Sequence, residues 1–272
     1  MLASTYEKQL PKGFNSYFYI IYTIHVKHHI LRKRMFDMNK FNKYCFALFL
    51  SSSFLLPLSF LTTVSAAGYY DSYEDLKEHE VLNEDYEINY KQRGSDITVI
   101  AIHGGGIEPG TSEVAKGLAN QMNISYYLFA GIKSTNNEIL HLTSKRFDEP
   151  TGRRMVQNSV SALSIHGYQG EEPIIYLGGR NEEYKELVRD YLQNRGFQVE
   201  DAPDHISGMS EENIVNDNQL RAGVQLELTA ELRKSFFKNH DWSRENRHNT
   251  TNIYDKLIDG LKEASDIYKE QL

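Results

Sequence analysis

The chain alternates between blocks of apolar residues with strand-like and with helical spacing. Three segments after Gly94 have helical spacing: residues 113–122, 182–195 and about 251–268. Thr111 and Ser112, just before the first of them, are residue types that cap helix starts. Seven short apolar runs are typical of strands: residues 97–103, 126–130, 139–143, 162–166, 174–177, 197–200 and 224–228. This alternation predicts a single α/β domain with a mixed, mostly parallel β-sheet flanked by helices.

The segments at the start of the chain follow a different pattern. A basic stretch that begins at Met38 leads into an apolar run over residues 46–61, and small residues follow up to Ala67. This layout is typical of a secretory signal peptide over residues 38–67, and residues 1–37 are interpreted as an over-extended gene start. The alternative is a membrane anchor, for which the apolar run is short. We therefore expect a secreted protein of residues 68–272, without stable membrane association after cleavage. Residues 68–93 show weak periodicity and predict one short helix.

The charge of this expected mature part limits its partners. Residues 68–272 hold 22 Lys and Arg against 35 Asp and Glu, so their net charge is −13. This balance argues against nucleic acid and anionic membranes as partners, although a local cationic cleft could still bind a polyanion. The single cysteine, Cys45, precedes this part, so any metal there would be held by His and carboxylate groups. We expect a monomer.

The first candidate for chemistry is the segment HGGGIEPGTS, which starts at His103 and follows the apolar run 97–102. Glycines at 104–106 allow a sharp turn that brings Glu108 back towards His103. A neutral imidazole and a carboxylate delivered from one loop are two ligands for a zinc ion. The alternative is a glycine turn whose His and Glu only hydrogen-bond the loop.

A second histidine lies at the end of another predicted strand. His166 ends the apolar run 162–166 and is followed by Gly167. Taken alone it could equally be a core residue, but beside His103 and Glu108 it would be a third ligand. A His/Glu/His set leaves one zinc position open, as catalytic sites do. The other histidines, His141 among them, are not expected to bind metal.

Glu227 is the candidate general base. It projects with Gln225 from one face of the otherwise apolar run 224–228. A buried carboxylate near the metal could take a proton from the attacking water and pass it to a leaving amine. The alternative is an edge strand with Glu227 in solvent.

The blocks around these residues resemble a known family. The blocks AIHGGGIEPGTSEVA, SYYLFAG, LHLTSKRFDEP, SIHG, YLGG, ENIVN and GVQLEL are similar, in this order, to the phage and bacillar poly-γ-glutamate hydrolases and their YjqB-like relatives. The resemblance runs from about Tyr86 to Phe236. It implies a zinc carboxypeptidase-like fold and a Zn²⁺-dependent γ-glutamyl hydrolase. It also implies that His103, Glu108 and His166 bind the metal and that Glu227 is the base.

A polyanionic substrate of this kind would need cations beside the metal. Guanidinium groups clamp carboxylates well, and Arg180, Arg153 and Arg221 lie in predicted loops or element ends near the family blocks. Arg180 is favoured because it follows two glycines, and His205 is a further substrate-contact candidate. One departure is Asp217, since the block ENIVN usually continues with a basic residue in the family. The basic segment 143–147 is another.

The leading hypothesis is a secreted zinc hydrolase that cleaves γ-glutamyl amide bonds of poly-γ-glutamate. One alternative keeps the zinc site and changes the substrate to cell-wall or other peptides. Another is a non-catalytic binding protein of the same fold.

Overall fold

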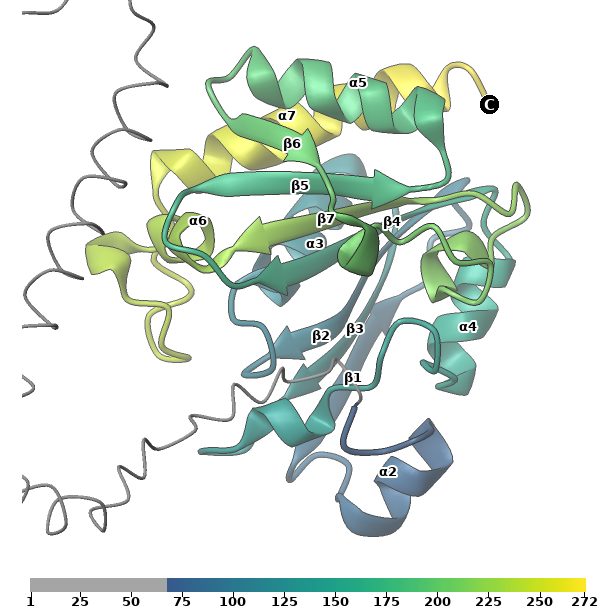
Figure 1. The fold of residues 1–272 in the computed structure, drawn as a ribbon, viewed down its shortest axis with the longest axis vertical. Coiled ribbons are helices and arrows are strands. Elements are labelled where there is room, and N and C mark those ends of the chain that lie inside the picture. Colours follow the sequence, from purple (N-terminus) through teal and green to yellow (C-terminus); the bar gives the residue numbers. More distant parts are fainter. Residues whose placement is uncertain (1–67) are drawn as a thin grey trace, which may run out of the picture. The chain divides into compact units, whose positions relative to one another are not determined.

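A seven-stranded mixed sheet organises residues 68–272, the part that the structure, a computed structural model, describes (Figure 1). The strands are β1 (Tyr86–Lys91), β2 (Ile97–Gly105), β3 (Ser125–Gly131), β4 (Ser161–Tyr168), β5 (Ile174–Gly179), β6 (Gln198–Asp201) and β7 (Val224–Thr229). Their order is β1-β3-β2-β4-β7-β5-β6. The predicted signal peptide and upstream segment lie outside the described residues. Within those residues, no helix is long and apolar enough to span a membrane.

The middle of the sheet is parallel, and its outer strands make it mixed. Strands β3, β2, β4 and β7 run in one direction, β1 pairs antiparallel with β3, and β5 pairs antiparallel with β7. The carboxyl ends of β2 and β4 therefore meet at the same edge, where ligands gather in such sheets. The predicted fold, a single α/β domain with a mixed and mostly parallel sheet, is confirmed.

Helices and loops cover both faces, as buried parallel strands require. Helices α3 (Thr111–Met122), α5 (Glu182–Gln193) and α7 (Asn252–Lys269) share one apolar core with the odd-numbered residues of β2, and Figure 1 shows α5 beside α7. Helices α2 (Tyr73–His79) and α4 (Pro150–Gln157) share the core of the other face with Ile100 and Ile102. The remaining short elements are η1 (Asn137–Leu140), η2 (Asp204–Ile206), η3 (Ile214–Asn216), α6 (Ala230–Ser235) and η4 (Lys238–His240).

Two strand assignments were wrong, and helices α4 and α6 were not predicted. The strand predicted at 139–143 is absent. The backbone there forms the short helix η1, which ends at Leu140, and then an extended segment that does not pair with the sheet. Leu140 and Leu142 are both buried. Strand β1 was missed, since it is a half-exposed edge strand whose polar residues hide the alternation. The predicted helix starts near 113, 182 and 251 are close to those of α3, α5 and α7.

Candidate functional site

A β-bulge near the end of β2 turns the side chain of His103 towards His166 on the neighbouring strand. Between Ala101 and Gly104, β2 advances three residues while β3 advances two. The side chains of Val99 and Ala101 point into the core under α3, and strict alternation would send His103 there too. The extra residue breaks this alternation, so His103 lies against His166 from the neighbouring strand instead.

The glycine segment then folds back and delivers Glu108. Gly105 has a φ of 65°, and a Cβ on it would lie 2.3 Å from the carbonyl oxygen of Gly131. The amide of Glu108 donates to the His103 carbonyl (2.9 Å), and Glu108 Oε2 accepts from the amide of Gly167 (2.7 Å). The loop after β2 therefore brings Glu108 back towards His103 and is hydrogen-bonded through Glu108 to the end of β4.

Thr111 and Ser112 do not cap α3, contrary to the prediction. Helix α3 begins at Thr111 after Gly110, with no side-chain cap. Thr111 Oγ1 donates to the carbonyl of Glu108 (2.9 Å), and Ser112 Oγ accepts from the amide of Gly105 (3.0 Å). The two hydroxyls fasten the glycine loop to the helix, so they support the site instead.

The three side chains predicted to bind a metal converge. His103 Nδ1 lies 3.0 Å from Glu108 Oε1 and 3.1 Å from His166 Nδ1, and His166 Nδ1 lies 3.8 Å from Glu108 Oε2. Both histidine side chains are almost fully buried, and the carboxylate is 14% exposed. Three potential metal-ligand atoms thus share one small buried space.

The hydrogen bond of His103 to the backbone leaves its other ring nitrogen facing that space. His103 Nε2 lies 2.7 Å from the carbonyl oxygen of Leu142, which only accepts, so Nε2 carries a proton. A neutral His103 then presents the lone pair of Nδ1 to Glu108 and His166. His166 Nε2 is buried and has no hydrogen-bond partner among the described residues. The described protein groups alone therefore leave one nitrogen of this cluster without a hydrogen-bond partner.

The protonation states favour metal ligation. Burial lowers the pKa of His166 to about 3, so this imidazole stays neutral. Burial raises the pKa of Glu108, but the charge of His103 and hydrogen bonds outweigh it and hold the pKa below its usual range. Burial also opposes the charge on His103, yet Glu108 raises the pKa of His103 overall. A metal ion would replace the proton that the carboxylate otherwise holds on His103.

His141 joins this cluster, although the sequence analysis expected no metal ligand there. Its ring stacks on His103 with centroids 3.7 Å apart, and its Nε2 lies 3.6 Å from Glu108 Oε1. His103, Glu108 and His141 have the spacing of a possible metal triad. The wrong prediction of a strand at 139–143 concealed this position of His141. The segment does not pair with the sheet, so it can bring the His141 ring to His103 on β2. A histidine between the buried Leu140 and Leu142 was the available signal.

The cluster fits a zinc ion. Imidazole nitrogens and carboxylates bind zinc at about 2.0–2.2 Å, which separates tetrahedral ligand atoms by about 3.3–3.6 Å. The observed separations of 3.0 to 3.8 Å around His103 and Glu108 span that value. His103 and Glu108 are common to both possible triads, and His166 or His141 completes the set.

Glu227 lies beside the cluster on the same face of the sheet. Its register partner on β4 is His166, and its side chain is buried. Burial raises the pKa of Glu227 well above its usual range, and the nearby charge of Glu108 raises it further. The alternative of an exposed edge strand is wrong, because β7 is an interior strand.

Arg233 ties together the three segments that carry these residues. From α6 its guanidinium donates to the carbonyls of Pro109 (2.8 Å), Tyr168 (3.1 Å) and Leu228 (3.0 Å). Arg233 is 5% exposed and stacks over Trp242, and its charge is attracted by the buried carboxyl groups of the site. No feature of the sequence singled out this residue.

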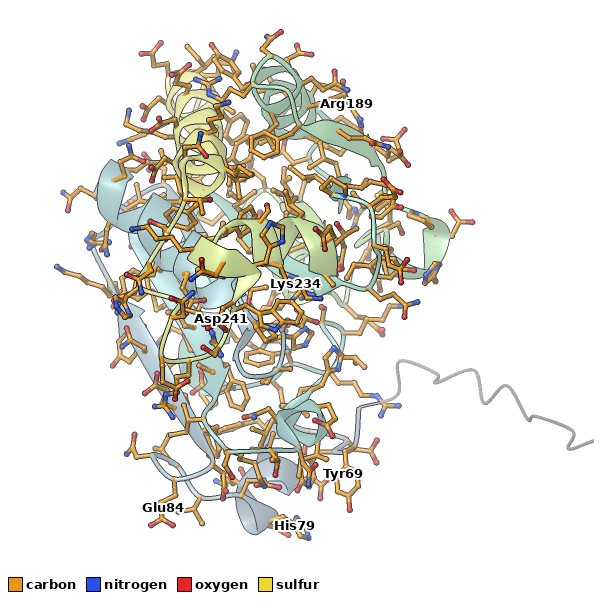
Figure 2. All side chains as sticks on the ribbon, turned by 90° about the vertical axis from the view of Figure 1, so that its left-hand side faces the viewer. Tyr69, His79, Glu84, Arg189, Lys234 and Asp241 are labelled. Atoms are coloured by element: carbon orange, nitrogen blue, oxygen red, sulfur yellow. The ribbon has the colours of Figure 1, made fainter. Side chains whose placement is uncertain are left out.

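Arg233→Met is expected to lower the free energy of unfolding by about 3–5 kcal/mol, because it leaves buried carbonyls and carboxylates without their cation. Urea unfolding of the two proteins measures this. The control is Arg189→Met, which removes ion pairs to the exposed Glu186 and Asp201 and should cost at most about 1 kcal/mol. Figure 2 shows Arg189 well apart from Lys234, the neighbour of Arg233. Equal losses in the two variants would contradict the role of Arg233.

The structure does not bring Arg153 and Arg221 to the cluster. Both pair with Asp217 at 2.7 Å, and the amides of Gln219 and Leu220 bond residues just before β4. This group therefore lies at the amino-terminal end of β4, opposite to His166. Asp217, the departure from the family pattern, serves as the anion for two arginines that were expected to bind substrate.

Arg180 is also displaced, while His205 is close. Because β5 runs against β7, its carboxyl end lies beside Val224, about 10 Å along the strand from Glu227. Arg180 pairs there with Glu211 (3.1 Å). His205 Nε2 lies 3.1 Å from the hydroxyl of Tyr168, two residues beyond His166. Of the four predicted substrate contacts, His205 alone lies near the cluster.

A sheet edge that gathers histidines and carboxylates with shifted pKa values in one buried cluster is a candidate active site. The family model for poly-gamma-glutamate hydrolase matches residues 70–259, so the chain belongs to this family. The resemblance seen in the sequence blocks is thereby confirmed.

The chain is also similar to named bacterial proteins. The UPF0714 proteins YndL and YmaC of Bacillus subtilis (strain 168) are 39% identical over 181 residues and 35% identical over 201 residues. These matches cover 65% and 71% of this chain and 70% and 83% of the relatives.

Two solved structures share the fold. A bacteriophage poly-gamma-glutamate hydrolase aligns with a TM-score of 0.74 and 33% identity, over 76% of this chain and 100% of that one. A structure described as zinc-free YndL aligns with a TM-score of 0.69 and 34% identity, over 73% and 98%.

Proposed function

We propose that this protein is a secreted, zinc-dependent hydrolase that cleaves the γ-glutamyl amide bonds of poly-γ-glutamate. The observation that carries the proposal is the convergence of His103, Glu108 and His166 beside the buried Glu227. The family and the bacteriophage relative, a poly-gamma-glutamate hydrolase by description, support the substrate. The description of YndL as zinc-free supports the metal.

In this proposal His103, Glu108 and His166 hold the metal, with His141 beside them. Bound zinc would supply a Lewis acid for the scissile carbonyl and for activation of water. Glu227 takes a proton from the attacking water and returns it to the departing amine. Burial and Glu108 raise the pKa of Glu227, which makes its carboxylate a stronger proton acceptor. His205 and Tyr168 offer polar donors for a substrate carboxylate at the rim.

The test is incubation of the purified, zinc-loaded protein with poly-γ-glutamate and with poly-α-glutamate. Gel analysis should show shortening of the γ-linked polymer only, and a chelator should stop it. Equal cleavage of both polymers would contradict the proposed specificity, and cleavage that persists in the chelator would contradict the metal.

Secretion is tested by amino-terminal sequencing of protein from the medium. The expected first residue is Ala67 or Gly68, because the small residues before it fit the cleavage rule. A cell-bound product that still carries residues 46–61 would indicate a membrane anchor instead.

A further inference from the structure

Two buried side-chain amides form a series of hydrogen bonds that ends at Glu227. Gln225 lies two residues earlier on β7 and so on the same face, and its Nε2 donates to Glu227 Oε1 (3.0 Å). Asn213, just before η3, donates from Nδ2 to Gln225 Oε1 (2.9 Å). Gln225 is 3% and Asn213 4% exposed, so water does not compete for these bonds.

Backbone groups fix the direction of this series. The amide of Val215 can only donate, and it donates to Asn213 Oδ1 (3.0 Å), so Asn213 Nδ2 must face Gln225. The carbonyl of Ile206 can only accept, and it accepts from Gln225 Nε2 (3.1 Å). The usual ambiguity of amide orientation is therefore removed at both residues. Gln225 can present only its N–H group to Glu227.

The neighbouring backbone is shaped around Gln225. Gly178 is the register partner of Gln225 on β5, and a Cβ on it would lie 2.3 Å from the carbonyl oxygen of Ser207. The missing side chain lets the segment with Ile206 and Ser207 approach the sheet. This approach places the Ile206 carbonyl on Gln225, so Gly178 of the family block YLGG supports the same series.

The series distinguishes the two oxygens of Glu227. Oε1 accepts the N–H of Gln225, whereas Oε2 accepts no hydrogen bond from the described residues. An amide donor neither takes nor gives up a proton at neutral pH. A carboxylate held in this way keeps Oε2 as its free oxygen and cannot rotate without losing a buried bond.

We propose that Asn213 and Gln225 are positioning residues that hold Glu227 with Oε2 directed at the reacting water. The inference rests on the proposed function, in which Glu227 is the base. Neither residue hydrogen-bonds His103, Glu108 or His166, so each would act on the rate through Glu227. The effect belongs in kcat rather than in KM, since orientation of the base matters only in the reaction step.

Asn213→Asp is the principal test, because it keeps the size of the side chain and replaces the donor by an acceptor. The new carboxylate and Gln225 Oε1 would then repel each other, and turning the Gln225 amide would set Oε1 against Glu227. The expected result is a kcat for poly-γ-glutamate about 10- to 100-fold lower, with KM within about twofold and zinc content unchanged. Gln225→Glu, which sets a carboxylate beside Glu227, should lower kcat at least as much.

Asn218→Asp is the matched control. Asn218 is equally buried in the same loop and donates to the carbonyls of Val215 and Ala222, with no bond to Glu227. This variant should melt at a lower temperature and keep its kcat. A fall in kcat equal to that of Asn213→Asp would overturn the positioning role, because any loosening of the loop would then suffice.

A double-mutant cycle tests the route of the effect. In a Glu227→Gln background, Asn213→Asp should not lower the residual rate further. An additive loss would overturn the inference. Unchanged kcat in Asn213→Asp and Gln225→Glu, together with a collapse in Glu227→Gln, would overturn the positioning role and leave the proposed function intact. Absence of turnover by the unaltered protein would overturn both.

Discussion

Replacement of Glu227 by Gln should lower the turnover of poly-γ-glutamate by about 10²–10⁴-fold while the protein keeps its zinc. The amide has the shape of the carboxylate, so it fits the buried position opposite His166. It cannot take a proton from water, so the proton shuttle between water and the departing amine is lost. Chain length on a gel and zinc content, measured on one preparation, test this.

The stability of this variant separates a catalytic from a structural role. Burial and the charge of Glu108 raise the pKa of Glu227, so the folded state disfavours its ionised form. Removing that charge should leave the melting temperature unchanged or slightly higher. The control Glu200→Gln alters an exposed carboxylate of β6 and should leave both rate and stability unchanged. If Glu227→Gln keeps most of its rate with zinc in place, the base lies elsewhere.

Much of the fold could be predicted because the buried parallel strands have unbroken apolar runs. The predicted ends of β2, β4 and β7 lie within about two residues of the observed ones. The half-exposed β1 could not be found in this way, since its alternation is weak. The false strand at 139–143 has the apolar spacing of a strand but lacks a partner in the sheet, and pairing is not visible in one sequence.

The convergence of His103, Glu108 and His166 was predictable for a local reason, and the positions of the substrate candidates were not. His103, Glu108 and His166 lie at or just after strand ends, and parallel strands bring such ends together. Arg180 lies away from the cluster because β5 runs antiparallel to β7, which places the carboxyl end of β5 beside Val224. Arg153 and Arg221 are bound to Asp217. Arg221 is only four residues from Asp217, but the pairing of Asp217 with Arg153 is long-range and no spacing indicates it. The positions of His141 and Arg233 beside the cluster likewise depend on how a loop and a helix pack in the fold, which no local sequence pattern indicates.

Metal binding is expected at about one zinc per chain, and three single variants distinguish the possible ligand sets. His103→Ala removes the nitrogen common to both sets and should abolish zinc retention and activity. His166→Ala should do the same, because His166 Nδ1 lies 3.1 Å from His103 Nδ1 and its neutral ring needs no proton displaced. His141→Ala should retain zinc, since the His141 side chain is 29% exposed whereas that of His166 is almost fully buried.

The measurement is zinc per chain after dialysis against a weak chelator, with circular dichroism to show that each variant is folded. His79→Ala is the control, because His79 is an exposed residue of α2 that Figure 2 shows far from Lys234 in α6. Zinc lost in His141→Ala but kept in His166→Ala would assign the triad to His103, Glu108 and His141. Stoichiometric zinc in both His103→Ala and His166→Ala would show that the cluster is not the metal site, since neither triad could then hold the ion.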